Sequence, residues 1–405
     1  MAEPLLKFDE RVLALKSEAA FEYLAMANEM AKKGMDIISF GIGQPDFDTP
    51  DFIKEEAKKA LDEGFTGYVE AKGIPELREA VAEYVNEATG SDVKPEEVII
   101  LPGAKPGIYF SALCFIRDGD EVIIPDPSYP VYESVVKHAG GRPVFVKLKE
   151  ENEFSLRPED LEGLINDRTR MIILNNPHNP TGSLLSPSDL KGILEIAKER
   201  GIIVLSDEIY DKYVYEGGFL SVLSDPDWRD YAIYVNGFSK TFSMTGWRLG
   251  YLIARREVID RMGVIALNTF SCTPGFIQRA GIVALKGVRE VIEERIKEFK
   301  RRRDAIYEAL KRLPGVKVVK PKGAFYIFPN FKEVMEGAGL STEELAMDIL
   351  RRKGVVTLPG TAFPERGGEG YLRLSFAVGV DKIERGIERI KEYIEEIQGS
   401  KGLRG

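Results

Sequence analysis

Short apolar runs alternate with helix-like stretches between about residues 98 and 254, and this alternation restricts the possible folds more than any other feature. A strand that is apolar at nearly every position is buried on both faces, which is typical of a parallel sheet covered by helices. The sequence therefore predicts an α/β domain with a mostly parallel sheet flanked by helices. The expected strands are Val98–Leu101, Glu121–Pro125, Pro143–Leu148, Arg170–Leu174, Ile202–Ser206, Ala232–Val235 and Leu249–Ile253, and the helices between them include Gly107–Phe115, Tyr129–Ala139 and Ser188–Arg200.

The pattern changes after about residue 285, where a long charged amphipathic helix begins. The elements expected from there on are a helix at about 288–313, a strand at 323–328, a helix at 342–353, a strand at 371–376 and a last helix at 381–397. This mixture predicts a smaller α+β domain, on which an amphipathic helix at 17–34 packs. We predict a large domain over residues 45–285 and a small domain formed by residues 1–44 together with 286–405.

The charge balance excludes several kinds of partner. The formal net charge is −9, whereas nucleic acids and anionic membranes bind surfaces with excess Lys and Arg. The N-terminus carries charges too early for a signal peptide, and no apolar stretch approaches the length of a membrane span. His138 and His178 are the only histidines, so a His-based metal site is not expected. We therefore expect a cytoplasmic protein with no nucleic-acid or membrane partner.

Lys240 lies in a polar turn just after a predicted strand, between Ser239 and Thr241, and Arg248 follows eight positions later. A lysine amine can form a Schiff base with an aldehyde, and a fixed arginine can bind a phosphate of the same molecule. Pyridoxal 5'-phosphate carries both groups. A basic turn on the surface would also account for so short a motif, so other segments must decide between the two interpretations.

Two further segments follow predicted strands and have the composition of binding loops. Around Gly103 and Ala104, small residues let backbone N–H groups approach an anion at a helix N-terminus, which indicates a phosphate cradle. Gly is common in such turns, so this signal is weak alone. In the segment 175–182, prolines restrict the backbone, and Asn179 is a candidate for orienting a ring hydroxyl or a carboxylate. A purely structural Asn/Pro turn is the alternative.

Asp207 ends an apolar strand, and Tyr210 follows it. A carboxylate in such a position needs a partner, and a pyridinium N–H is one that would keep an electron-accepting ring protonated. Tyr210 is a candidate donor to the phenolic oxygen of the same ring. The alternative interpretation is that Asp207 caps a helix.

Taken together, these segments resemble the class I/II pyridoxal-phosphate-dependent aminotransferases, and most of all the aspartate aminotransferases of thermophilic, archaeal-type prokaryotes. The resemblance covers nearly the whole chain in the order of the family, and it implies that family's fold and pyridoxal 5'-phosphate as cofactor. The segments that carry it are Gly41–Pro50, Asn175–Gly182, Ser206–Tyr210 and Ser239–Gly250.

The resemblance implies a role for each matching residue. Catalysis is assigned to Lys240, Asp207 and Tyr210, with Asn179 and Tyr210 on the ring oxygen and Tyr129 stacked on the ring. The implied phosphate ligands are Arg248, Ser239 and the backbone around Gly103, Ala104 and Lys105. Tyr68 matches a tyrosine that reaches the phosphate of a neighbouring subunit, which implies a homodimer.

Substrate contacts are implied in the same way. Arg373 matches the arginine that binds the substrate α-carboxylate, a task that suits its planar fork; Gly43, Asn179 and Tyr129 are assigned to the same substrate. The segment 267–274 lacks the arginine that animal and enteric relatives use for a distal carboxylate. Lys105 is the alternative, because some bacterial relatives use a lysine in this turn.

The sequence therefore predicts an aminotransferase that moves the α-amino group of an amino acid, aspartate first, to 2-oxoglutarate in a ping-pong reaction. An aminotransferase of broad or aromatic specificity stays open, as does a β-lyase or cyclopropane-forming synthase on the same fold. A cofactor-binding regulator would carry an added basic DNA-binding module, for which this chain shows no sign.

Overall fold

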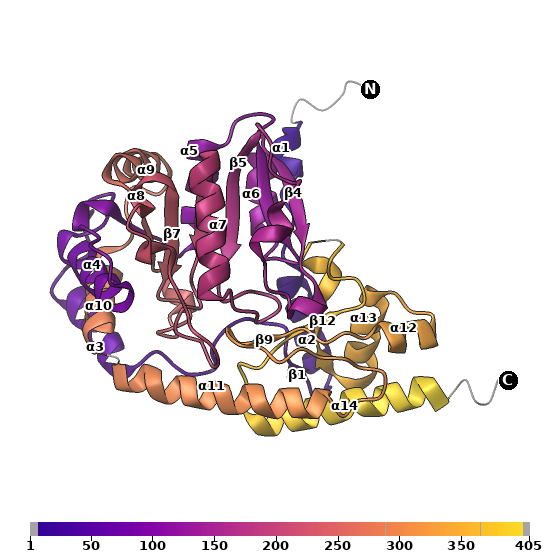
Figure 1. Cartoon of the computed structure of the whole chain (residues 1–405). Coiled ribbons are helices and arrows are strands. Elements are labelled where there is room, and N and C mark those ends of the chain that lie inside the picture. Colours follow the sequence, from indigo (N-terminus) through magenta and orange to yellow (C-terminus); the bar gives the residue numbers. More distant parts are fainter. Residues whose placement is uncertain (1–6, 288, 365, 400–405) are drawn as a thin grey trace, which may run out of the picture.

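The computed structural model describes residues 7–287, 289–364 and 366–399, so the parts of the predicted small domain at 1–6 and 400–405 lie outside the described residues. A seven-stranded sheet in the order β2-β8-β7-β6-β5-β3-β4 forms the centre of the larger part (Figure 1). Only β8 runs antiparallel to its neighbours there, which confirms the mostly parallel sheet. The strands are β2 (Val98–Leu101), β3 (Glu121–Asp126), β4 (Arg142–Lys147), β5 (Thr169–Asn175), β6 (Ile203–Asp207), β7 (Ala232–Gly237) and β8 (Gly250–Ile253).

The direction of the strands brings four chain segments to one edge of this sheet. Because β8 is antiparallel to both β7 and β2, β2 runs in the same direction as the parallel strands. The last residues of β2, β5, β6 and β7 therefore lie at the same edge, and ligands of open α/β sheets bind at such an edge. These residues are Leu101, Asn175, Asp207 and Gly237.

Alternate side chains along each strand enter two different cores, one on each face of the sheet. In β2, Ile99 and Leu101 pack with α5, α6 and α9, whereas Val98 and Ile100 pack with α3, α4, α7 and α10. Both faces are therefore covered by helices, as Figure 1 shows, which explains why the middle positions of the inner strands are apolar. The helices are α3 (Asp51–Asp62), α4 (Pro75–Thr89), α5 (Lys105–Phe115), α6 (Val131–His138), α7 (Pro187–Arg200), α9 (Arg256–Thr269) and α10 (Gly275–Gly287), with a short α8 (Trp228–Tyr231).

The smaller part combines residues from both ends of the chain. A three-stranded antiparallel sheet, β11-β12-β9, packs with helices beside a parallel pair, β1-β10. Phe40, close to the N-terminus, is buried in the same core as Phe325, Leu350 and Ile387. The elements are α1 (Glu10–Leu13), α2 (Ala19–Lys32), β1 (Ile38–Ser39), α11 (Arg289–Leu310), β9 (Tyr326–Ile327), α12 (Lys332–Ala338), α13 (Thr342–Lys353), β10 (Val355–Val356), β11 (Leu358–Pro359), β12 (Leu372–Ser375) and α14 (Val380–Gly399), of which α1 contacts α6 of the larger part.

Local signals explain where several helices begin and end. In α13, Ser341 and Glu344 form a capping box, and Gly354 ends the helix with a left-handed backbone, as both residue types favour. The strand predicted at 323–328 is shorter than expected, because Ala324 has a φ of 52°, which is not an extended conformation. The long helix α11 runs from the larger part to the smaller one (Figure 1), and the division at residues 45 and 285 stays a prediction.

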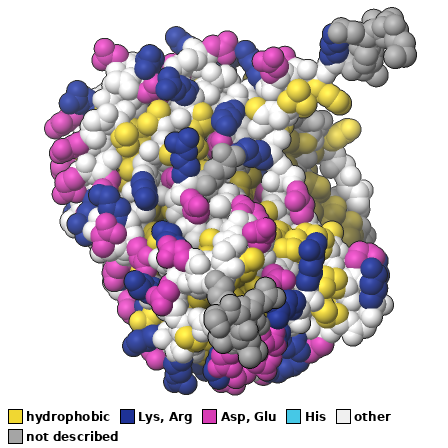
Figure 2. Space-filling model, turned by 90° about the vertical axis from the view of Figure 1, so that its right-hand side faces the viewer, with side chains coloured by type: hydrophobic (Ala, Val, Ile, Leu, Met, Phe, Trp, Pro, Cys, Tyr) yellow, Lys and Arg dark blue, Asp and Glu magenta, His cyan; other side chains and the backbone are white. Residues whose placement is uncertain are grey.

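The surface carries both signs of charge. Figure 2 shows Lys and Arg side chains intermixed with Asp and Glu over the face that it presents, which is typical of a solvated protein surface. In the part of the chain that the structure describes, no helix combines the length and the apolar character that a membrane span requires.

Candidate active site

A cavity of about 540 Å³ lies at the sheet edge where β2, β5, β6 and β7 end. Segments from both ends of the chain close it, since Glu18, Gly43 and Arg373 are among its walls. The structure thus brings together most of the residues predicted from sequence. Those that line the cavity are Gly43, Ala104, Lys105, Tyr129, Asn179, Asp207, Tyr210, Ser239, Lys240, Arg248 and Arg373.

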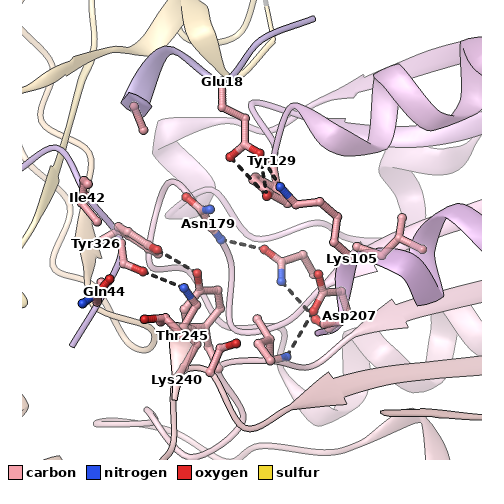
Figure 3. A pocket seen from close by; sticks show the side chains of 18 of the residues that line it. Glu18, Ile42, Gln44, Lys105, Tyr129, Asn179, Asp207, Lys240, Thr245 and Tyr326 are labelled. Carbon is pink, nitrogen blue, oxygen red and sulfur yellow. Dashed lines mark hydrogen bonds and ion pairs between the residues drawn. The ribbon is translucent and has the colours of Figure 1, made fainter. Parts of the chain in front are cut away.

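Lys240 lies in the turn that follows β7 and points into this cavity (Figure 3). Its Nζ donates to the carbonyl of Gly43 at 2.6 Å, and the hydroxyl of Tyr213 donates to the Lys240 carbonyl at 2.8 Å, which holds the turn in place. Loss of solvent around the amine, followed by the nearby charges of Arg373 and Arg248, lowers the pKa of Lys240 to about 8. A substantial share of this amine is therefore neutral near pH 8, as a nucleophile or base requires.

Asp207 is the last residue of β6 and is 4% exposed. Its carboxylate accepts a hydrogen bond from the Tyr132 hydroxyl at 2.8 Å and one from the backbone N–H of Ile209 at 3.2 Å. Burial raises its pKa to about 6, and no ion pair with it is found among the described residues. A turn rather than a helix follows it, so Asp207 is no helix cap. A buried carboxylate of this kind favours a cationic ligand.

Arg248 and the start of α5 form a positive, donor-rich corner. Arg248 has a left-handed backbone with a φ of 56°, and its guanidinium donates to the carbonyls of Thr245 at 2.8 Å and Pro102 at 3.4 Å. Gly103 has a φ of +94°, and a Cβ there would overlap that guanidinium. Gly103 does not line the cavity itself, but it leaves the room that Arg248 occupies. The first turn of α5 has no side-chain cap. Pro106 has no N–H and that of Gly107 donates to the Ala104 carbonyl at 2.9 Å, so the N–H groups of Ala104 and Lys105 are the ones suited to an anion.

Arg373 lies on β12, the middle strand of its sheet, and is 4% exposed. Its guanidinium donates to Asn179 Oδ1 at 3.2 Å and to the carbonyl of Gly41, while its Nε has no partner among the described residues. Burial lowers the pKa of Arg373 from its usual range. A buried guanidinium with a spare donor at a cavity wall is suited to bind a carboxylate.

Several residues of this site were not predicted from the sequence, and three of them bond to predicted residues. Tyr132 donates to Asp207 as described, and it falls in a proline-rich segment that supplied only Tyr129 as a candidate. The hydroxyl of Tyr326 lies 2.7 Å from that of Tyr210; the sequence placed Tyr326 in a strand without a role. Glu18, the third, had no motif around it, and only the folded chain brings it into the cavity.

Lys105 and Glu18 form an ion pair at the opposite end of the cavity from Lys240 (Figure 3). Lys105 Nζ lies 2.5 Å from Glu18 Oε1, and the hydroxyl of Tyr129 donates to Glu18 Oε2 at 3.2 Å. Burial, together with the negative charge of Glu18, raises the pKa of Tyr129 well above its usual range. Lys105 therefore faces the cavity as predicted, but with its charge already balanced.

Besides Gly103, one further residue predicted from the sequence lies outside this cavity. Tyr68 is 91% exposed and does not line it, so its assignment to a neighbouring subunit stays a prediction. Arg279, which follows the segment 267–274 closely in the sequence, is also absent from the cavity walls and is paired with Glu56 at 3.2 Å and with Glu63 at 3.6 Å. Among the described residues, the larger part therefore contributes three cationic side chains to the cavity: Lys240, Lys105 and Arg248.

Comparison with known proteins agrees with this geometry. Residues 35–390 match the family of aminotransferase class I and II. An aspartate aminotransferase of Sulfurisphaera tokodaii is 50% identical over 97% of this chain and 98% of its own length, and one of Sulfolobus acidocaldarius is 48% identical over 97% and 99%. A solved aspartate aminotransferase of Thermus thermophilus with maleate superposes with a TM-score of 0.90 at 34% identity, covering 96% of this chain and all of the other.

The agreement extends over nearly the whole molecule. The family match includes the strands of the central sheet, the turns at their carboxyl ends and β12 of the smaller part, which together supply most of the cavity walls. Likeness of sequence at this level, with near-complete coverage on both sides, establishes common descent rather than a shared fold alone. This chain belongs to the class I and II aminotransferase family.

Proposed function

We propose that this protein is a pyridoxal 5'-phosphate-dependent aminotransferase that moves the α-amino group of aspartate to 2-oxoglutarate in a ping-pong reaction. One observation carries the proposal: three groups of the described structure face one cavity. They are a lysine with a lowered pKa, a buried aspartate that has no ion pair among the described residues, and a buried arginine whose Nε has no partner among them. Each of these is unfavourable for the fold alone, and such groups concentrate at sites of chemistry.

The residues present fit this cofactor. The Lys240 amine matches its aldehyde, the Asp207 carboxylate matches a protonated ring nitrogen, and Arg248 with Ser239 and the first turn of α5 matches its phosphate. When bound, the cofactor supplies an electrophilic carbon for amines and a ring that withdraws electrons from the substrate Cα. The burial of Asp207 without an ion pair among the described residues supports this assignment most strongly, because a cationic partner would offset the cost of burying the carboxylate.

Within this arrangement, each protein group has a defined task. Lys240 Nζ accepts the proton from the substrate Cα as a general base, a task that its pKa of about 8 suits. Asp207 holds a positive charge on the ring nitrogen, and the Tyr132 hydroxyl orients that carboxylate. Asn179 and Tyr210 direct an amide and a hydroxyl toward the cavity, and Tyr129 forms an aromatic wall.

The substrate is oriented by its α-carboxylate. Arg373 contributes a planar guanidinium to the cavity wall, and Asn179 holds it in place at 3.2 Å. A Cβ at Gly43 would overlap the Tyr326 hydroxyl, so a side chain there would displace a wall of the cavity. An α-amino acid held in this way presents its Cα to Lys240, which is the positioning that catalysis requires.

Aspartate is proposed as the donor on two grounds. The relatives named above are aspartate aminotransferases, and the Thermus structure contains maleate, a four-carbon dicarboxylate. Lys105 provides a cation at the distal end of this cavity, where a side-chain carboxylate would lie. An aromatic donor is the second candidate, because Phe21 and Ile42 add apolar surface to the same cavity.

The proposed enzyme is a homodimer in which Tyr68 reaches the phosphate of the neighbouring site. Its high exposure supports this, because a tyrosine on the surface of one chain is free to contact another. The large domain over residues 45–285 and the small domain from residues 1–44 and 286–405 are proposed to move as units about the cavity between them.

A substrate panel tests the function directly. The protein, loaded with cofactor, is incubated with single amino acids in the presence and absence of 2-oxoglutarate, and both products are quantified. Equal amounts of glutamate and the new 2-oxo acid, formed only with 2-oxoglutarate, are expected. Ammonia and a 2-oxo acid formed without any acceptor would instead identify a β-lyase.

A further inference from the structure

Glu18 occupies an unusual position for a carboxylate at the start of a helix. It is the N-cap residue of α2, yet its side chain makes no capping hydrogen bond, although acidic side chains near a helix N-terminus are stabilised there. The carboxylate instead enters the cavity and accepts from Lys105 and Tyr129. Glu18 therefore lacks a local capping hydrogen bond and instead contacts Lys105, which lies 87 residues away in the sequence.

The charge of Glu18 acts on the cavity as a whole. Its negative charge opposes the lowering of the pKa values of Arg373 and Lys240, although burial has the larger influence on both. Glu18 is therefore a carboxylate inside the substrate cavity, paired with the cation to which the distal carboxylate of an acidic substrate would bind. Its side chain is 22% exposed, and that of Lys105 is 45% exposed, so both can exchange partners without opening the core.

We propose that Glu18 is a specificity-determining residue, an inference that rests on the proposed function. Its carboxylate competes with the distal carboxylate of acidic substrates for Lys105. A dicarboxylic substrate binds only after its carboxylate has replaced that of Glu18. A substrate with an uncharged side chain leaves the Glu18–Lys105 pair intact and lies against Phe21 and Ile42. Glu18 thereby reduces the preference for acidic over aromatic substrates that Lys105 alone would produce.

Competition of this kind has a definite consequence for Glu18→Gln. The substituted side chain keeps nearly the same shape but loses the charge, so Lys105 becomes available to a substrate carboxylate. Charge-assisted hydrogen bonds are stronger than neutral ones by an amount that corresponds to about tenfold in affinity. Affinity for dicarboxylates should rise, and affinity for an aromatic monocarboxylate should stay the same.

Calorimetric titration of the cofactor-loaded protein tests this without turnover. Succinate and 3-phenylpropanoate both lack an amino group, so neither reacts. We expect Glu18→Gln to bind succinate about tenfold more tightly than the parent, with 3-phenylpropanoate changed by less than about twofold. In the Lys105→Ala background, the same substitution should leave the affinity for succinate unchanged.

A matched control removes the same charge outside the cavity. Glu22 lies on the exposed side of α2, where it contacts Ser17, and Glu22→Gln should leave both affinities unchanged. If Glu18→Gln binds succinate with the parent's affinity or more weakly, the competition is refuted, and weaker binding would mean that Glu18 positions Lys105 for the substrate. An equal gain in Glu22→Gln would also refute it, since a general charge effect would then be responsible.

The outcome is distinguishable from a failure of the proposed function. If the parent transfers no amino group from any donor to 2-oxoglutarate, the proposed function is wrong whatever the titrations show. If the parent is active but Glu18→Gln has unaltered ligand affinities, only the role of Glu18 is wrong. As a second variant, Glu18→Ala should shift affinity in the same direction, since it too leaves Lys105 without its carboxylate partner.

Discussion

The two ends of the cavity differ in how firmly their charged groups are held. At one end, Asp207 is the last residue of β6 and Lys240 follows the neighbouring strand β7. Burial raises the pKa of Asp207 and lowers that of Lys240. At the other end, Lys105 and Glu18 are partly exposed and belong to a helix start and an N-terminal segment. The first arrangement is rigid, whereas the second can exchange partners.

This difference matches the demands of the proposed reaction. Proton transfer needs groups within hydrogen-bond reach and with adjusted pKa values, which a buried sheet edge can provide. Recognition of different side chains needs only a modest difference in binding free energy, which a partly exposed ion pair at the cavity wall can supply. Substitutions at the sheet edge should therefore abolish catalysis for every donor, and substitutions at the distal end should change the ratio between donors.

The largest effect is expected for Lys240. Replacing it by Ala removes both the attachment point and the base, so turnover should fall by at least about 10⁴-fold for all donors. In the parent, borohydride reduction followed by peptide mapping should place the cofactor on Lys240, and attachment should become faster as pH rises through about 8. Lys322→Ala, which alters an exposed lysine paired with Glu153, is the control. An adduct on another lysine would contradict the assignment.

Asp207→Ala should keep the fold and reduce turnover by about 10³-fold, because the electrostatic stabilisation at the ring nitrogen is lost. Tyr132→Phe, which removes only the hydroxyl that donates to this carboxylate, should have a much smaller effect. Steady-state rates with aspartate and with phenylalanine would measure both. Near-normal turnover of Asp207→Ala would reduce this residue to a structural role and remove the contrast between the two ends.

Lys105→Ala should distinguish the donors. A charge-assisted contact to a distal carboxylate corresponds to about tenfold to a hundredfold in specificity, so kcat/KM for aspartate should fall by that factor and change less for phenylalanine. Lys58→Ala on α3, an exposed lysine paired with Glu55, is the control. An equal loss for both donors would assign Lys105 to the phosphate turn, and no loss for either would exclude it from the site.

Burial of the charged Asp207 carboxylate should lower the free energy of unfolding near neutral pH. Its folded pKa is about 6, against 3.8 ordinarily, so between these values the folded state binds more protons than the unfolded state. Stability contributed by this group is therefore present at low pH and is lost as pH rises through about 4 to 6. Without cofactor, Asp207→Asn should be more stable than the parent by about 1–3 kcal/mol at pH 7. Urea unfolding at pH 4.5 and pH 7 measures the difference, and an equal effect at both values would contradict it.

The smallest effect is expected at Tyr68, which belongs to neither end of its own cavity. Tyr68→Phe removes one hydrogen bond to the phosphate in the neighbouring subunit, which should weaken cofactor binding by about fivefold. Equilibrium dialysis would measure the affinity for the cofactor, and light scattering would measure the molar mass of the protein. If the parent were monomeric and still bound the cofactor with full affinity, the neighbouring subunit would have no part in the site.

Local patterns in the sequence were sufficient for most of the sheet edge. Apolar runs identified every strand of the central sheet, because burial on both faces favours apolar side chains at the middle positions of the strands. Lys240 and Asp207 were found because each follows such a strand, and the parallel direction of those strands brings their ends together. Arg373 required the resemblance to a family, since an arginine on a strand is otherwise typical of an exposed edge.

Contacts between distant segments were beyond the reach of those patterns. The pair β1 and β10 joins two-residue strands, Ile38–Ser39 and Val355–Val356, which have no periodicity to detect. Tyr132 and Tyr326 lay in recognised segments, but their hydroxyl partners depend on how those segments fold together.

The sequence by itself determined the sheet, its functional edge and the candidates Lys240 and Asp207 at that edge, because these follow from burial and from short motifs. The tertiary structure alone decided the state of the distal end. Lys105 could be named from its turn, but the pairing with Glu18 arises only when the N-terminal segment lies across the cavity. An ion pair between residues so far apart in the chain leaves no local signal, since neither side chain affects the conformation around the other until the protein has folded.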